Sequence, residues 1–126
     1  MPDEKGLKIL VVDDFLATRT IVINHLNKLG YRNTVEAENG FSALARLKSA
    51  LFDLVVTDCS MYDMNGLELL KQIRSDSELK HIPVLMVTSE DLQGNIIPAF
   101  KAGLNDYIVR PFEEYKFKQK LEKIFV

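Results

Sequence analysis

Three short, nearly continuous apolar runs limit the folds that this chain can adopt. They are Ile9–Val12, Asp53–Thr57 and Val84–Val87. None of them alternates apolar with polar residues, so each predicts a strand covered on both faces, as in a parallel sheet. Asn33–Ala37 and Asp106–Val109 are more polar, as strands at the edges of a sheet are. The sequence therefore predicts five strands, three of them central.

Between these runs, residues recur three or four positions apart, as they do along one face of a helix. The positions are Thr18, Val22, Leu26 and Leu29, then Ala43, Leu44, Leu47 and Leu51, then Leu67, Leu70 and Ile73, and finally Phe117, Leu121, Ile124 and Phe125. Strands that alternate with helices predict an α/β domain with a parallel sheet. No linker interrupts the pattern, so we expect residues 1–126 to form one domain without an output domain.

The segment Asp91–Gly103 is the weakest helical pattern because it contains Gly94 and Pro98. Proline lacks an N–H group and clashes with the carbonyl four residues earlier unless it lies in the first turn. We therefore expect a helix that begins late, near Ile97, or one that is kinked or frayed at its beginning.

Charge and hydropathy exclude several classes of partner. With 16 basic and 18 acidic residues the formal net charge is −2, which gives no electrostatic footprint for nucleic acid. The longest aliphatic runs are far shorter than the ~20 residues of a membrane span, so no membrane partner is expected. The lone Cys59 cannot form an internal disulfide, and no secretory signal precedes the first strand. These features favour a cytoplasmic protein.

Polar side chains follow the predicted strands at the points where they end. Asp13 and Asp14 follow the first strand and Asp58 the third, and the carboxyl ends of parallel strands lie at one edge of a sheet. Three carboxylates there repel one another, and a divalent cation with oxygen ligands, Mg²⁺ or Ca²⁺, offsets that repulsion. The alternative for Asp13 and Asp14 is that they cap the following helix.

Two more strand ends carry groups that suit phosphoryl chemistry. Thr88 follows the fourth predicted strand, Val84–Val87, and Arg110 follows the fifth, Asp106–Val109. A metal, a hydroxyl and a fixed cation around one carboxylate can position a phosphoryl group and neutralise its charge. Taken singly, Thr88 fits a helix cap and Arg110 a surface charge, but together they favour the phosphoryl site.

The chain resembles, over essentially its whole length, the receiver domain of two-component response regulators, and most closely the CheY-type chemotaxis regulators. The segments that carry the resemblance are Leu10–Asp14, Asp58 with Met61 and Gly66, Val87–Ser89, Arg110–Phe112 and Asn65–Lys71. It implies a flavodoxin-like (βα)5 fold with a parallel sheet in the strand order 2-1-3-4-5. It also implies a phospho-accepting switch, not an enzyme.

The resemblance assigns roles to the residues at the strand ends. It implies that Asp58 accepts the phosphoryl group. Mg²⁺ is then held by Asp13, Asp14, Asp58 and the backbone carbonyl of Ser60. The hydroxyl of Thr88 closes onto the phosphoryl group.

A second set of roles concerns the surface that partners read. The resemblance implies that Tyr107 turns inward when Thr88 moves, and that the Arg110–Pro111 peptide bond is cis. It places the contact surface on the fourth helix, the fifth strand and the last helix. The candidate contacts are Ile96, Tyr107, Lys120 and Lys123.

Three positions depart from the family pattern. Arg110 stands where the family has lysine, Tyr62 where it usually has proline, and Ser60 where the chemotaxis regulators have asparagine. The planar guanidinium of Arg110 can pair with a carboxylate through two hydrogen bonds. We therefore expect it to hold Asp58 in the resting state and to limit the movement of Thr88.

By the same resemblance, the expected partners of this monomer are a histidine kinase of the chemotaxis type, the flagellar motor switch protein and, as a third candidate, a phosphatase. The alternative is a phosphate-sink or phosphorelay receiver that does not bind the motor. A flavodoxin and a haloacid-dehalogenase-type phosphatase fit less well. Asp13 and Asp14 would repel the flavin phosphate of the first, and the Asp-x-Asp pattern of the second is missing after Val12.

Cys59, His25 and His81 are interpreted as residues without a chemical role, the two histidines at the surface.

Overall fold

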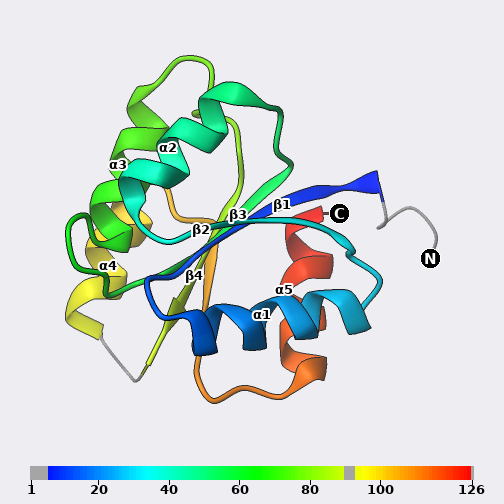
Figure 1. The fold of residues 1–126 in the computed structure, drawn as a ribbon. Helices are drawn as coiled ribbons and strands as arrows, with labels where there is room; N and C mark the ends of the chain where they lie inside the picture. Colours follow the sequence, from blue (N-terminus) through cyan, green and yellow to red (C-terminus); the bar gives the residue numbers. More distant parts are fainter. Residues whose placement is uncertain (1–5, 90–92, 126) are drawn as a thin grey trace.

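A computed structural model gives the fold of residues 6–89 and 93–125 (Figure 1). Within these ranges, strands and helices alternate along the chain. The strands are β1 (Lys8–Val12), β2 (Asn33–Ala37), β3 (Leu54–Asp58), β4 (Val84–Thr88) and β5 (Asp106–Val109). The helices are α1 (Leu16–Lys28), α2 (Gly40–Ser49), α3 (Gly66–Ser75), α4 (Gln93–Lys101) and α5 (Glu114–Phe125).

The strands form one parallel sheet in the order β2-β1-β3-β4-β5. Every residue of β3 and β4 is buried, and β1 is buried from Ile9 to Val12. The two more polar strands, β2 and β5, lie at the edges. The predicted fold class, strand order and division into central and edge strands are therefore confirmed.

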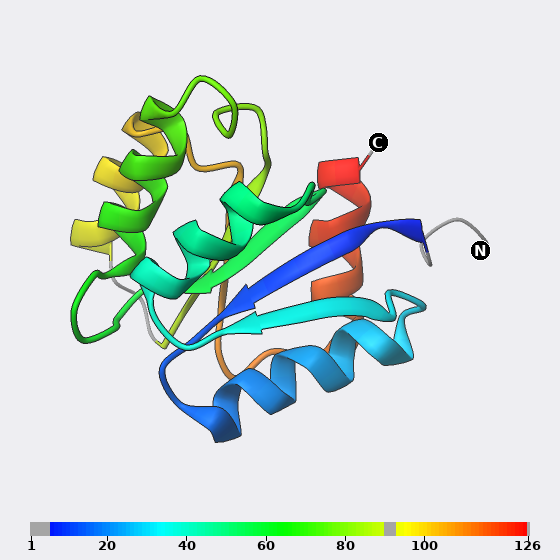
Figure 2. The same cartoon turned by 45° about the horizontal axis from the view of Figure 1, so that its top comes forward.

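Helices cover both faces of the sheet, which explains why the central strands are apolar throughout. Figures 1 and 2 show α1 and α5 on one face and α2, α3 and α4 on the other. Ile9 and Val11 of β1 pack into the core beneath α1 and α5. Leu10 and Val12 pack into the core beneath the other three helices. Successive side chains of a strand point to opposite faces, so both sets must be apolar.

Local signals in the sequence account for several helix boundaries. Gly30, directly after the C-cap residue of α1, has a φ of +102°, a conformation that favours glycine. Asn65 caps α3, and its side chain and that of Glu68 form a capping box. Leu51, which we expected in the apolar stripe of α2, is 90% exposed. That expectation is wrong because α2 ends at Ser49 and the chain leaves it in an extended conformation.

The fourth helix begins earlier than the sequence predicts. It starts at Gln93, four residues before Ile97, and contains Pro98, so the prediction of a late start is wrong. Burial of Ile96 and Ala99, three residues apart on one face, favours the helix although proline cannot donate to the Gly94 carbonyl. The beginning of the predicted segment, Asp91 and Leu92, lies outside the described residues. A kink at this end stays a prediction.

Within the part of the chain that the structure describes, no helix is both long and apolar enough to cross a membrane.

Candidate functional site

The predicted carboxylates meet at the carboxyl edge of the sheet. Asp13, Asp14 and Asp58 each offer an oxygen atom, and these atoms lie within 4.8 Å of one another. They line a cavity of about 600 Å³ whose other walls are Phe15, Thr18, Ser60, Met61, Tyr62 and Arg110. The loops after β1 and β3, which are adjacent in the sheet, bring the three carboxylates together, while Thr18 of α1 and Arg110 after β5 complete the wall.

This group of oxygen atoms fits a small divalent cation. Asp13 and Asp58 are buried, and Asp14 is the most exposed of the three carboxylates. Carboxylate ligands on one side and access to solvent on the other suit Mg²⁺, which keeps several of its waters. Ser60 lines the same cavity, where its backbone carbonyl was expected to act as a further ligand.

A close approach of α3 to β3 determines where Asp58 lies. The backbone N–H of Gly66 donates to the carbonyl of Cys59 at 2.9 Å. A Cβ atom at Gly66 would lie 2.6 Å from the carbonyl oxygen of Asp58 and 3.1 Å from the Cα atom of Cys59. Glycine is therefore required if the first turn of α3 is to lie against the end of β3.

Burial raises the pKa of the Asp58 carboxyl above its ordinary value. The hydrogen bond from Arg110 opposes this increase, while the nearby charge of Asp13 adds to it. The net direction is upward, so the ionised form of Asp58 is less favoured than in an exposed aspartate. A bound cation would favour that ionised form.

Arg110 holds Asp58 as the sequence predicts, although with a different geometry. One terminal nitrogen of its guanidinium donates to Oδ1 of Asp58 at 2.7 Å, and the other lies 3.9 Å from Oδ2 of Asp13. The guanidinium thus bridges two carboxylates, whereas the sequence suggested that both its arms would pair with one. The Arg110–Pro111 peptide bond is cis, as the resemblance implied.

Comparison with known proteins agrees with this geometry. Residues 9–122 match the response regulator receiver domain. The chain belongs to the response regulator receiver family. It is similar to chemotaxis protein CheY-3 of Vibrio cholerae serotype O1, at 54% identity over 121 residues, which cover 96% of this chain and 93% of that protein. It is therefore the receiver domain of a CheY-like chemotaxis response regulator.

Solved structures show the same fold. The structure of Vibrio cholerae CheY4 matches this receiver with a TM-score of 0.86 at 31% identity, covering 94% of this chain and 98% of that one. The receiver domain of the sensor histidine kinase PA1611 from Pseudomonas aeruginosa matches with a TM-score of 0.85 at 26% identity, covering 95% and 98%. That domain was solved with a magnesium ion coordinated in its active site cleft.

Thr88 and Tyr107 of this receiver are not among the described residues that line the carboxylate cavity. Thr88 is buried at the end of β4. Its backbone carbonyl accepts the backbone N–H of Arg110 at 2.7 Å. Tyr107 is half-buried, with its ring centroid 6.0 Å from that of Phe100. The ammonium group of Lys120 lies 5.4 Å from the same ring.

The structure corrects one residue of the predicted contact surface. Ile96 is 9% exposed and packs inward, whereas Ile97 beside it is 61% exposed. Helical geometry turns neighbouring residues to different faces, and the sequence alone did not show which isoleucine faces the core. Lys123 is exposed, and Lys120 is held by Asp106 at 3.0 Å.

Sequence reasoning missed two residues that contact Asp13. The Thr18 hydroxyl lies 2.5 Å from Oδ2 of Asp13, and the Arg19 guanidinium donates to the backbone carbonyl of Asp13 at 2.6 Å. The spacing of the apolar residues places Thr18 on the apolar face of its helix. The hydroxyl of Thr18 is the one feature of the sequence that indicates a polar contact here, because a polar group on such a face requires a partner.

The residues interpreted as chemically inactive differ in their surroundings. Cys59 is buried, and burial followed by the charge of Asp58 raises the pKa of its thiol, which disfavours a reactive thiolate. His81 is exposed as predicted. The prediction for His25 is wrong, because its ring is half-buried, with its centroid 5.2 Å from Phe112 and 6.0 Å from Phe117.

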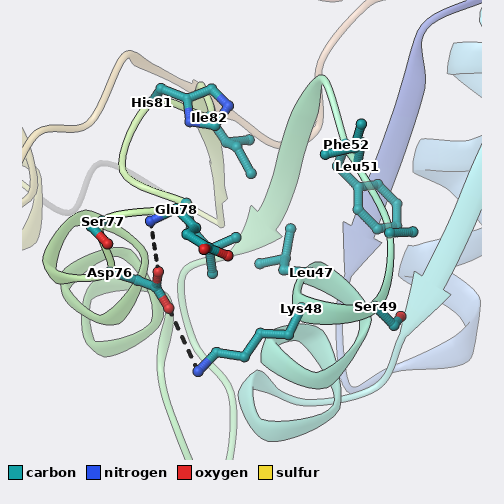
Figure 3. A pocket seen from close by; sticks show the side chains of 12 residues that line it. Leu47, Lys48, Ser49, Leu51, Phe52, Asp76, Ser77, Glu78, His81 and Ile82 are labelled. Atoms are coloured by element: carbon teal, nitrogen blue, oxygen red, sulfur yellow. Dashed lines mark hydrogen bonds and ion pairs between the residues drawn. The ribbon is translucent and has the colours of Figure 1, made fainter.

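A larger hollow of about 950 Å³ lies at the opposite edge of the sheet, between the segments that precede β3 and β4 (Figure 3). Its floor is apolar, with Leu47 and Phe52 buried. At its rim Lys48 lies 3.5 Å from Asp76, which also accepts the backbone N–H of Glu78 at 2.8 Å. These polar groups pair with one another, so the carboxylate cavity is the better candidate for phosphoryl chemistry.

Proposed function

We propose that this receiver is a phospho-switch in which Asp58 accepts a phosphoryl group from a phosphohistidine on a sensor kinase. The observation that carries the proposal is the convergence of three carboxylate oxygens within 4.8 Å. Asp13, Asp14, Asp58 and the backbone carbonyl of Ser60 are assigned as ligands of Mg²⁺. The magnesium site of the PA1611 receiver supports this choice of metal.

In the transfer step, an oxygen of Asp58 forms a bond to phosphorus while the bond from phosphorus to the donor imidazole nitrogen breaks. The electron pair of the broken bond stays on that nitrogen. Because Arg110 binds Oδ1 of Asp58, we assign the attack to Oδ2. Mg²⁺, when bound, supplies positive charge that neutralises the phosphoryl oxygens. Asp58 is only 7% exposed, which limits competition from water.

The signal leaves the site through Thr88 and the face formed by α4, β5 and α5. The Thr88 hydroxyl is assigned to the phosphoryl group and Tyr107 to the coupled side-chain movement. A backbone hydrogen bond already joins Arg110 to Thr88. Tyr107, Ile97 and Lys123 then present the changed surface to a partner.

The proposed partners are a histidine kinase of the chemotaxis type and the flagellar motor switch protein, with a phosphatase as the third. The similarity to a chemotaxis protein over almost the whole chain supports the motor switch. A phosphate-sink or phosphorelay receiver would share the site but would not bind the motor.

Phosphorylation by acetyl phosphate with Mg²⁺ tests the assignment of Asp58. Intact-mass measurement should show one added phosphoryl group on the wild type and none on Asp58→Asn. Asp63→Asn is the matched control, because Asp63 is an exposed aspartate in the same loop, and it should be labelled like the wild type. Equal labelling of Asp58→Asn would contradict the proposal.

A further inference from the structure

Both carboxylates beside the acceptor are held by donors that the resemblance does not assign. Oδ2 of Asp13 lies 2.5 Å from the hydroxyl of Thr18, in the first turn of α1. Oδ2 of Asp14 accepts the backbone N–H of Tyr62 at 3.1 Å. One donor comes from the helix after β1 and the other from the loop after β3, so they hold the acidic pair from two sides.

The Thr18 contact fixes the orientation of a buried carboxylate. An ionised carboxylate can only accept, so the hydroxyl of Thr18 must donate to Asp13. Oδ1 of Asp13 accepts the backbone N–H of Phe15 at 2.9 Å, so both of its oxygens are held. Each carboxylate oxygen has two lone pairs, so capacity for a metal ligand remains.

The Tyr62 contact depends on the backbone and not on the aromatic ring. The side chain of Tyr62 is 89% exposed, whereas its N–H lies at the rim of the cavity against Asp14. Proline at this position would have no N–H to donate. The contact joins the loop after β1 to the loop after β3 across the mouth of the cavity.

We propose that the Thr18 hydroxyl and the backbone amide of residue 62 are positioning groups for the two metal ligands, Asp13 and Asp14. They orient these carboxylates toward Asp58 and offset part of the repulsion among the three charges. The inference rests on the proposed function, because it concerns the same Mg²⁺ site. Groups that orient metal ligands in this way typically change metal affinity by about 10- to 100-fold.

Replacement of Thr18 separates the hydroxyl from the packing. Thr18→Val removes the hydroxyl at nearly constant shape, and Thr18→Ser keeps it. Calorimetric titration with MgCl₂ should show about tenfold weaker binding for Thr18→Val and near wild-type binding for Thr18→Ser. Thermal unfolding in EDTA confirms that both variants fold. Equal Mg²⁺ affinity of the two variants would overturn the role of Thr18.

Replacement of Tyr62 separates the N–H from the side chain. Tyr62→Pro removes the donor, and Tyr62→Ala keeps it while removing the ring. We expect weaker Mg²⁺ binding, again by about tenfold, only in Tyr62→Pro. Equal affinity of these two variants would overturn the role of the amide.

Amide exchange in EDTA gives a readout that needs neither metal nor phosphoryl transfer. The Tyr62 amide should exchange faster in Asp14→Ala than in the wild type, while the Asp63 amide serves as the internal reference. If the exchange rate of the Tyr62 amide is unchanged, its hydrogen bond to Asp14 does not protect it, and the role of this amide is overturned whether or not Asp58 is phosphorylated. Failure of phosphorylation with accelerated exchange would instead contradict the proposed function alone.

Discussion

At the scale of single residues, Asp58 combines burial with a hydrogen bond from Arg110. Burial raises its pKa in the folded state, so its protonated form is favoured by folding. The contribution of Asp58 to the free energy of unfolding is therefore favourable at low pH, and it is lost as the pH rises through the pKa of Asp58 in the folded state. Asp58→Asn stays neutral, so its stability advantage over the wild type should grow from acid to neutral pH. Urea unfolding in EDTA at several pH values measures this, and a constant or shrinking advantage would contradict it.

Asp13 and Asp14 are neighbours, but the structure predicts opposite effects of removing them. Asp13 accepts the backbone N–H of Phe15 and the hydroxyl of Thr18 at the beginning of α1. Asp13→Ala should therefore lose about 1 kcal/mol or more, because the Phe15 N–H and the Thr18 hydroxyl lose a largely buried acceptor. Asp14→Ala removes a charge from the cluster and one exposed contact, so it should be as stable as the wild type or more stable in EDTA. A clear loss of stability for Asp14→Ala would show that its role is structural.

At the scale of elements, the contact of α3 with the end of β3 is the tightest constraint on the site. A Cβ atom at Gly66 would meet backbone atoms of Asp58 and Cys59, which cannot rotate away as a side chain can. Gly66→Ala should cost about 1–3 kcal/mol and slow labelling of Asp58, because the strand end must shift. Gly6→Ala is the control, since nothing lies within 4 Å of a Cβ atom there. Equal stability of both variants would contradict the close approach.

The fourth helix carries its proline beyond the first turn. Pro98 cannot donate to the carbonyl of Gly94, so the first turn of α4 lacks one backbone hydrogen bond. Pro98→Ala should stabilise the helix, by up to about 3 kcal/mol if no other contact is lost. Amide exchange from Gln93 to Ile97 should be faster than in α5 for the wild type and slower in the variant. Protection in the wild type equal to that of α5 would refute this.

At the scale of the whole molecule, the sequence predicts what strand periodicity and strand ends determine. Continuous apolar runs identify β3 and β4, and the carboxyl edge of a parallel sheet brings Asp13 and Asp58 together. Which side chains of α4 are buried depends on tertiary packing. It buries Ile96 and exposes Ile97, and no local signal in the sequence distinguishes them.

Contacts between distant segments were equally hidden from the sequence. The hydrogen bond from Tyr62 to Asp14 joins residues 48 positions apart through a backbone group that every residue except proline carries. The guanidinium of Arg110 bridges Asp58 and Asp13, which sequence spacing cannot indicate. These contacts depend on how adjacent loops lie at the edge of the finished sheet.

We expect phosphorylation of Asp58 to change the affinity of this receiver for the flagellar motor switch protein. The most direct measurement is the affinity of wild type and Asp58→Asn for the motor switch protein, with and without acetyl phosphate and Mg²⁺. We predict that acetyl phosphate tightens binding of the wild type by about 5- to 150-fold, the usual range of coupling between two sites. The affinity of Asp58→Asn should not change. Equal affinity of the wild type in both states, or binding in neither, would contradict the claim and favour the phosphate-sink or relay alternative.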